Sequence, residues 1–275
     1  MELITPRQIE ILNIAREKGR VNVEELAERF SVTPQTIRKD LNDLCDRRML
    51  QRVHGGAVLA SGVENMGYEA RNTLALEQKR RIGLRTAALL PDNCSLFINI
   101  GTTTEQVARS LTSHRGLLVI TNNINVANIL RPSPGIEVII AGGLVRRNDG
   151  GVVGEATAEF INQFKVDYAV IGASAIEEDG AILDYDHREV RVAQAIIRNA
   201  RRVVLVADSM KFARSAPVRI AHLSQINIFV TDSPLPPALD EIARQHGVQV
   251  EIAAERGAEE AALGGRDLLP DARNS

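Results

Sequence analysis

The sequence predicts an α/β protein in two parts, a small helical unit followed by a larger unit built on a parallel sheet. Residues 1–57 contain short helices with clear start signals. Beyond residue 74, short apolar runs alternate with helical segments, and runs that are apolar on both faces are typical of parallel strands covered by helices. Charge divides the chain similarly, because residues 1–85 carry a net charge of +3 and the remainder −5.

The overall composition excludes several classes of protein. A net charge of −2 excludes a polycation that holds nucleic acid by bulk charge, and 3% aromatic residues argue against a platform that stacks unpaired bases. Two cysteines, Cys45 and Cys94, make neither a disulfide framework nor a four-ligand zinc site, which suits a reducing cytoplasm. The first residues lack the features of a signal peptide, and no apolar run approaches the roughly 18 residues that span a bilayer. We expect a cytoplasmic protein with no membrane partner.

Three helix starts define the first unit. Thr5 followed by Pro6 and Gln8 forms a capping box with proline at the first helical position, and Asn22 with Glu25 forms a second such signal. Thr33 before Pro34 starts the third helix after a tight turn. Helix, short turn and helix in this order predict a helix-turn-helix.

The third helix has a polar face suited to DNA. Its core face carries Ile37, Leu41 and Leu44, and the opposite face exposes amide, hydroxyl and basic side chains that read base edges and bind phosphates. The alternative is an ordinary solvated helix face. The candidate DNA-binding residues here are Thr33, Gln35, Thr36, Arg38, Lys39 and Asn42.

The segment that follows, Leu50 to Val58, predicts two short strands around a Gly-Gly turn, as in the wing of a winged helix. Arg52 and His54 are candidates for contacts with backbone phosphate, although a turn histidine bonded to its own backbone explains His54 equally well. The first unit therefore predicts a winged helix-turn-helix that binds double-stranded operator DNA.

The second unit is predicted over residues 74–254, after a linker at 58–73 and before a disordered tail at 255–275. Its apolar runs each end in a polar or glycine-rich turn, which predicts a Rossmann-like, mainly parallel sheet. The runs cover residues 96–100, 117–120, 136–141, 168–172, 203–207, 226–231 and 248–252.

The turn after the first of these runs is a candidate anion site. Gly101 permits close backbone approach, and Thr102, Thr103 and Thr104 add hydroxyls at a predicted helix N-terminus, where N–H groups bind anions without formal charge. The alternative is a polar turn capped by threonine, which is common in α/β folds.

Other strand ends supply further polar groups, and ligands of open α/β sheets collect at the carboxyl ends of strands. Lys211 would pair with phosphate, and Asp184, Asp186 or Glu189 would accept hydrogen bonds from hydroxyls. These groups predict a small phosphorylated polyol or sugar. Arg146 and Arg147 could approach an anion as well. The alternatives are an ordinary surface lysine at 211, an acid favoured by the helix dipole at 189 and a solvated loop at 146–147. The remaining candidates are Asn122, Asn123, Gly142 and Gly143.

Several segments resemble the DeoR family of bacterial repressors. In the first unit these are Val-Glu-Glu-Leu-Ala-Glu-Arg-Phe, Thr-Pro-Gln-Thr-Ile-Arg-Lys-Asp-Leu and His-Gly-Gly-Ala, and in the second Phe-Ile-Asn-Ile-Gly-Thr-Thr-Thr and Asp-Tyr-Asp-His-Arg-Glu-Val-Arg. The resemblance implies that Gln35, Thr36, Arg38 and Lys39 lie on a recognition helix, and that the sensor domain has a ribose-5-phosphate isomerase-like fold.

Residues 149–157, Asp-Gly-Gly-Val-Val-Gly-Glu-Ala-Thr, resemble one subgroup of this family. That resemblance implies control of genes for glycerol catabolism, with sn-glycerol 3-phosphate as the best candidate effector, and favours a tetramer. Two positions depart from the family pattern, Ala175 in place of glycine and Met210 in place of serine.

These observations predict a repressor that is not an enzyme and uses neither metal nor cofactor. The alternative is a sugar-phosphate isomerase-like enzyme with an appended DNA module, in which Glu189, Asp208 and Lys211 would move protons. A third possibility is a DNA-bound scaffold with a vestigial sensor. Because one winged helix covers one half-site, we expect a homodimer or homotetramer.

Overall fold

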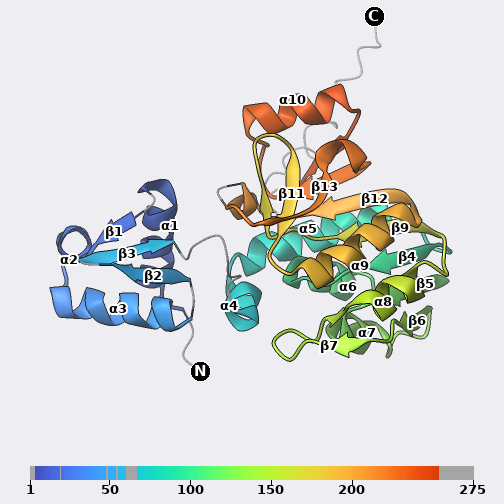
Figure 1. Ribbon diagram of the computed structural model, residues 1–275, viewed down its shortest axis with the longest axis horizontal. Coiled ribbons are helices and arrows are strands. Elements are labelled where there is room, and N and C mark those ends of the chain that lie inside the picture. The colour runs from blue at the N-terminus through green and yellow to red at the C-terminus, as the bar shows by residue number, and fades with distance from the viewer. Residues whose placement is uncertain are drawn as a thin grey trace, which may run out of the picture.

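The computed structural model describes residues 4–18, 20–47, 49–53, 55–59, 67–212 and 214–253. The chain forms an N-terminal unit and a larger C-terminal unit, with one short helix between them (Figure 1). His54, residues 60–66 of the expected linker and the expected tail at 255–275 lie outside the described residues.

The N-terminal unit is the predicted winged helix-turn-helix. It contains α1 (Pro6–Lys18), α2 (Val23–Phe30), α3 (Pro34–Asp46) and an antiparallel sheet in the order β1-β3-β2, formed by Arg20–Asn22, Gly56–Leu59 and Leu50–Val53. The capping box at Thr5 is present, with its hydroxyl accepting from the Gln8 N–H at 3.2 Å. Strand β1 was not predicted, because three residues between two helices are too few to show an alternating pattern.

The C-terminal unit is built on a seven-stranded parallel sheet in the order β15-β14-β12-β9-β4-β5-β6. Each of the predicted apolar runs overlaps one of these strands. In sheet order the strands are Gln249–Ile252, Ile228–Thr231, Ala200–Val206, Val166–Ile171, Ser95–Ile98, Leu117–Thr121 and Ile136–Ile140.

Helices cover both faces of this sheet, which explains why its central strands are apolar throughout. Leu96 and Ile98 of β4 pack with the helices on one face, and Phe97 between them packs on the other. The first face carries α5 (Leu76–Leu89), α6 (Thr102–Ser110) and α7 (Ile124–Leu130), and the second carries α8 (Glu155–Ile161), α9 (His187–Arg198) and α10 (Pro237–Gln245). No helix in the described ranges is long and apolar enough to cross a membrane.

Short antiparallel elements surround the carboxyl ends of the strands. A hairpin of β7 (Leu144–Val145) and β8 (Val152–Val153) follows β6. A second small sheet joins β10 (Ala175–Ile176), β11 (Ala181–Asp184) and β13 (Val218–His222), and two 3-10 turns, η1 (Ser209–Lys211) and η2 (Leu223–Gln225), complete the unit. The hairpin and the small sheet were not predicted, since strands this short carry little sequence pattern.

The residues just before the second unit form α4 (Tyr68–Thr73), although this part of the chain was predicted as linker. Two bonds fasten α4 to the second unit. The Tyr68 hydroxyl donates to Glu105 Oε2 at 2.8 Å, and Arg71 forms an ion pair with Asp149 at 3.2 Å. Lys79 Nζ also donates to the carbonyls of Arg71 and Leu74. The end of the connecting segment is therefore part of the sensor surface.

Candidate functional site

The third helix presents the predicted DNA-binding side chains to solvent. Gln35, Arg38, Lys39 and Asn42 are exposed, and Ile37 on the opposite face is fully buried. Thr33 caps the helix, because its hydroxyl accepts from the Thr36 N–H at 3.2 Å. The first turns of α3 therefore offer amide, hydroxyl and basic groups on one face, as base readout in the major groove requires.

An ion pair and a hydrogen bond hold α3 against the first helix. Arg7 Nε donates to the buried Asp40 carboxylate at 2.6 Å, and Gln8 donates to Asp43 at 3.4 Å. On the exposed side, Arg38 lies 3.5 Å from Glu24, with both side chains largely solvated. A solvated ion pair of this kind contributes little to stability, so Arg38 can exchange Glu24 for a DNA phosphate with little loss of free energy.

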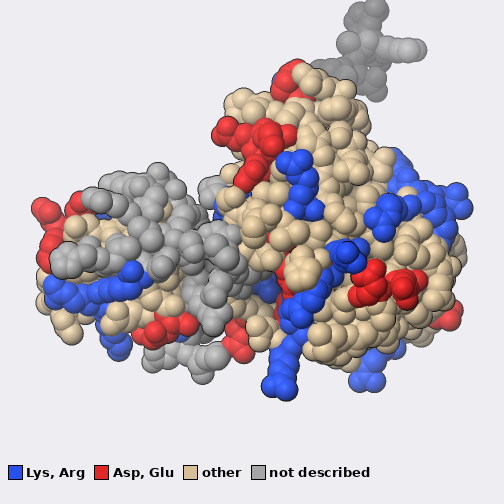
Figure 2. All heavy atoms as spheres, viewed as in Figure 1, with Lys and Arg blue, Asp and Glu red and all other residues tan. Residues whose placement is uncertain are grey.

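The wing adds a further basic group, since Arg52 on β2 is exposed. Figure 2 shows Lys and Arg side chains gathered along the part of the N-terminal unit where Figure 1 draws α3. The DNA-binding residues remain predictions, but their exposure and their common face agree with that role.

A small pocket lies in the second unit, at the point where the strand order reverses. Strands β5 and β6 extend the sheet from β4 in one direction, and β12, β14 and β15 extend it from β9 in the other. Such a switch point opens a crevice between the carboxyl ends of the two central strands. The pocket is lined by Arg71, Ile100, Gly101, Thr102, Thr103, Gly172, Ala173, Ser174, Asp184, Glu189 and Lys211.

One end of this pocket is suited to an anion. Gly101 has φ +152°, and a Cβ there would lie 3.3 Å from the Thr104 hydroxyl, so glycine lets the chain turn directly from β4 into α6. Thr102 and Thr103 begin that helix and line the pocket, where helix N–H groups lack intrahelical partners. Thr104 points the other way, because its hydroxyl donates to the carbonyls of Asn99 and Gly101, both at 2.8 Å.

Two cations also line the pocket. Lys211 comes from η1, at the carboxyl end of β12, and Arg71 comes from α4. Burial of the ammonium group, together with the neighbouring Arg214, lowers the pKa of Lys211 to about 7. An incoming phosphate would offset both effects, so the pocket favours a ligand that brings negative charge.

Carboxylates organised around Arg146 lie beside the pocket, and one of them, Asp149, also pairs with Arg71. This guanidinium binds Asp149 at 2.7 Å, Asp186 at 3.1 Å and Glu189 at 2.6 Å. Burial disfavours the Asp149 carboxylate, but the bonds from Arg146 outweigh it and hold the pKa of Asp149 below its ordinary value. Arg146 is therefore a structural hub and not the solvated loop residue that was the alternative.

Glu189 behaves differently from the other acids. Burial and the nearby Asp184 raise the pKa of Glu189 to about 8 despite its bond to Arg146. Ser174 donates to Asp184 at 2.9 Å within the same wall of the pocket. This wall offers a hydroxyl, a carboxylate and a carboxyl group that readily holds a proton, which together can bind the hydroxyls of a polyol. Among the described residues, no group of acidic, histidine and cysteine side chains is arranged to hold a metal ion.

The pocket brings together six of the predicted effector residues, namely Gly101, Thr102, Thr103, Asp184, Glu189 and Lys211. The others lie outside its lining. Asn122 donates to the Val152 carbonyl at 3.1 Å and holds the β7–β8 hairpin. Asn123 caps α7 and donates to Glu105 at 3.2 Å. Gly142 and Gly143 are exposed beyond β6, and Gly142 accepts a bond from Thr157.

Arg71 is the charged lining residue that was not predicted from the sequence. It stood in the expected linker, and a helix of six residues is too short to show a clear period. The available signal was an arginine within a weakly helical segment next to the sensor. The two departures from the family pattern also find places. Ala175 is buried in β10 without a positive φ, and Met210 packs against the core cluster of the N-terminal unit.

Comparison with known proteins matches one family model to each of the two units. Residues 7–63 match the model of the DeoR-like helix-turn-helix domain, and residues 74–233 match that of the DeoR C-terminal sensor domain. The glycerol-3-phosphate regulon repressor of Escherichia coli K12 is 43% identical over 90% of this chain and 98% of its own length. The HTH-type transcriptional repressor CsqR of the same organism is 39% identical, over 90% of this chain and 94% of its own.

Among solved structures, a ribose 5-phosphate isomerase from Methanocaldococcus jannaschii matches 50% of this chain and 55% of its own, with 14% identity and a TM-score of 0.38. The family assignment rests on the two domain matches and on the similarity to the curated repressors. The chain belongs to the DeoR family of transcriptional regulators, with an N-terminal helix-turn-helix and a C-terminal sensor domain.

Proposed function

We propose that this protein represses genes of glycerol or glycerol 3-phosphate catabolism and leaves its operator when a small phosphorylated polyol binds the sensor. The best candidate for that effector is sn-glycerol 3-phosphate. Two observations support the proposal. A relative with 43% identity is named the glycerol-3-phosphate regulon repressor. The lining of the pocket also combines two cations and a helix N-terminus with hydroxyl and carboxyl groups, which is the chemistry that recognises a phosphate and a polyol.

The observation that carries the proposal is the meeting of Lys211, Arg71 and the α6 N-terminus in one pocket. The phosphate would accept bonds from the first N–H groups of α6 and from the hydroxyls of Thr102 and Thr103. Lys211 and Arg71 would neutralise its charge. A neutral polyol would leave these donors and cations unsatisfied.

The polyol end of the effector would lie against Ser174, Asp184 and Glu189. A protonated Glu189 can donate a hydrogen bond to a hydroxyl, and the Asp184 carboxylate can accept one. Because Glu189 already binds Arg146, we assign it to binding and not to proton transfer.

Helix α4 offers a physical link from the pocket to the DNA-binding unit. Arg71 lines the pocket, and Ala70 and Leu74 on the same segment belong to one packed cluster with the core of the winged helix. Met210, next to Lys211, packs against that cluster too. An effector that draws Arg71 away from Asp149 would move α4, and so change how the two units pack.

Release from DNA then follows from linkage. An effector that prefers the conformation with weak DNA affinity shifts the population toward it, and the same coupling makes DNA weaken effector binding. A palindromic operator has two half-sites, so we propose that a homodimer or homotetramer binds it, in the cytoplasm where genomic DNA is accessible.

Calorimetric titration of the full-length protein with a panel of small phosphates tests the sensor proposal without DNA. We expect binding of sn-glycerol 3-phosphate, and no binding of glycerol at the same concentration. Lys211→Gln should weaken binding at least tenfold, whereas Lys165→Gln, a lysine at the opposite end of the sheet, serves as the matched control. Failure of every phosphorylated polyol and sugar in the panel to bind would refute the proposed effector class.

A further inference from the structure

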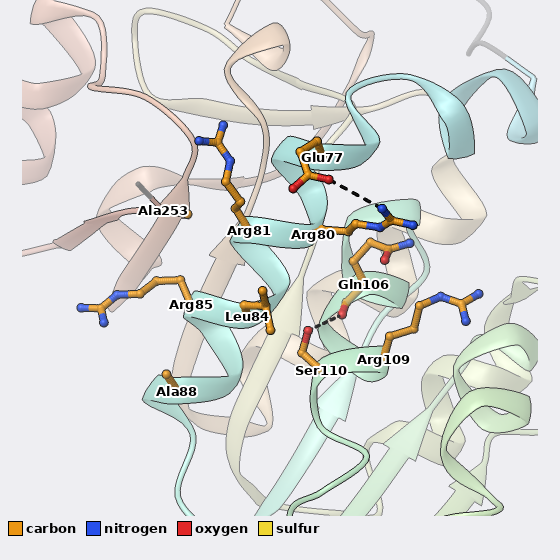
Figure 3. A pocket seen from close by; sticks show the side chains of 10 residues that line it. All are labelled: Glu77, Arg80, Arg81, Leu84, Arg85, Ala88, Gln106, Arg109, Ser110 and Ala253. Atoms are coloured by element: carbon orange, nitrogen blue, oxygen red, sulfur yellow. Dashed lines mark hydrogen bonds and ion pairs between the residues drawn. The ribbon is translucent and has the colours of Figure 1, made fainter. Parts of the chain in front are cut away.

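A second hollow, of about 660 Å³, lies on the outer faces of α5 and α6 (Figure 3). Four arginines line it, Arg80, Arg81, Arg85 and Arg109, and Leu84 lies between them with 55% of its surface exposed. Figure 3 shows Arg81 and Arg85 extending to the side of Ala253, and Arg80 and Arg109 to the other side. The surface is therefore basic at both edges and apolar at its centre.

Acidic side chains within the described ranges neutralise this groove only in part. Arg85 pairs with Glu251 of β15 at 2.5 Å. Arg80 lies 3.6 Å from Glu77, but both side chains are more than half exposed, and such pairs contribute little. Arg109 has no carboxylate within ion-pair distance among the residues that the structure describes. The groove thus favours an acidic occupant that also carries apolar groups.

A second copy of the chain fits this requirement poorly. In a two-fold contact the same patch meets itself, so arginines would face arginines across the interface. The chain itself supplies a better match. Ala253 lines the groove and is the last described residue, and the next residues include Glu255, Glu259 and Glu260 against one arginine, Arg256. Apolar side chains accompany them, ending with Leu263.

Length and position favour this occupant as well. Ten extended residues reach at most about 33–36 Å, whereas α5 rises only about 16 Å between the groove's first and last lining positions. A segment tethered at Ala253 also has an effective concentration in the millimolar range at the groove, so weak ion pairs suffice to hold it. A glutamate just before this segment already binds the groove, because Glu251 of β15 pairs with Arg85.

We propose that residues 254–263 bind in the groove between α5 and α6, with their glutamates on the arginines and Leu263 and the alanines covering Leu84. The segment would neutralise this surface and stabilise α5 against α6. The proposal does not depend on the effector. With this segment bound, only residues 264–275 are still expected to form a disordered tail.

Hydrogen exchange of the full-length protein tests this binding. Glu255→Gln, Glu259→Gln and Glu260→Gln together should make amides on the exposed faces of α5 and α6 exchange roughly threefold to tenfold faster at low salt. Asp267→Asn with Asp271→Asn, farther along the same tail, is the matched control and should change nothing. The difference should disappear in about 1 M salt, where ion pairs are screened.

A second comparison checks the assigned partners. Arg81→Gln with Arg109→Gln should reproduce the faster exchange, and adding the three glutamate changes should then have no further effect. Equal exchange in the wild type and the glutamate variant at low salt would overturn the proposal. Protection that appears only at high protein concentration would overturn it too, because a second copy would then be the occupant.

Discussion

Raising the pH above neutrality should weaken effector binding, because the phosphate needs a protonated Lys211. The pKa of Lys211 is about 7 in the empty pocket, since burial and Arg214 disfavour its charge. An anion bound beside it favours the charged form, so binding raises that pKa and takes up a proton. The affinity for the effector is therefore highest below about pH 7 and falls as the pH rises above the pKa of Lys211.

The size of the fall in affinity follows from the pKa of about 7 for Lys211. About half of the Lys211 side chains carry a proton at pH 7, and about one in eleven at pH 8. The second pKa of a phosphate ester is about 6, so the ligand gains little charge in this window. We expect affinity to fall about fivefold between pH 7 and pH 8, and about tenfold more by pH 9.

Calorimetry in buffers of different ionisation enthalpy measures both the affinity and the proton uptake. Lys211→Arg is the informative variant, because arginine stays protonated throughout this range. It should make the fall in affinity above pH 7 shallower while keeping the positive charge, and Glu189, whose pKa is about 8, accounts for the fall that remains. An affinity that is constant or rising between pH 7 and pH 9 in the wild type would show that Lys211 does not bind the effector phosphate.

Three further predictions concern the DNA-binding unit and its link to the sensor. Lys39→Ala should weaken operator binding by roughly 1 kcal/mol in a fluorescence anisotropy titration, and should lower the number of counterions released on binding by about one. The control variant Lys165→Ala should change neither quantity. A salt dependence equal to that of the wild type would show that Lys39 does not contact DNA. Met210→Ser should change the effector dissociation constant measured by calorimetry by no more than about twofold, but should reduce the loss of DNA affinity that the effector causes. An equal loss in the variant and the wild type would show that Met210 does not couple the sensor to the winged helix. Asp40→Asn should lower the unfolding free energy of the winged helix by about 1–2 kcal/mol in urea denaturation, because Arg7 loses its charged partner but stays partly solvated; no change would show that the pair is not stabilising.

Features that depend on local pattern could be predicted from the sequence. The start of α3 at Thr33, its buried face and its polar face follow from capping and helical period. The parallel strands follow from apolar runs that end in polar turns. Gly101 and the threonines after it could be found because strand and helix N-terminus are adjacent in the chain.

Features that depend on distant partners could not be predicted. Arg146 binds Asp186 and Glu189, which lie 40 and 43 positions away in the chain, so nothing local distinguishes it from a solvated loop arginine. Arg71 enters the pocket only because α4 folds back onto the second unit. Asn122 and Asn123 have polar side chains at a strand end, but they are occupied by the hairpin and by Glu105 instead of facing the crevice.

The central claim is that a phosphorylated polyol in the sensor controls the winged helix. The direct test is a titration of full-length protein against an operator duplex that it selects from a random pool, with and without sn-glycerol 3-phosphate. We predict that DNA affinity falls at least tenfold with sn-glycerol 3-phosphate and does not change with glycerol. Tight binding to the duplex that no phosphorylated polyol or sugar alters would contradict the account.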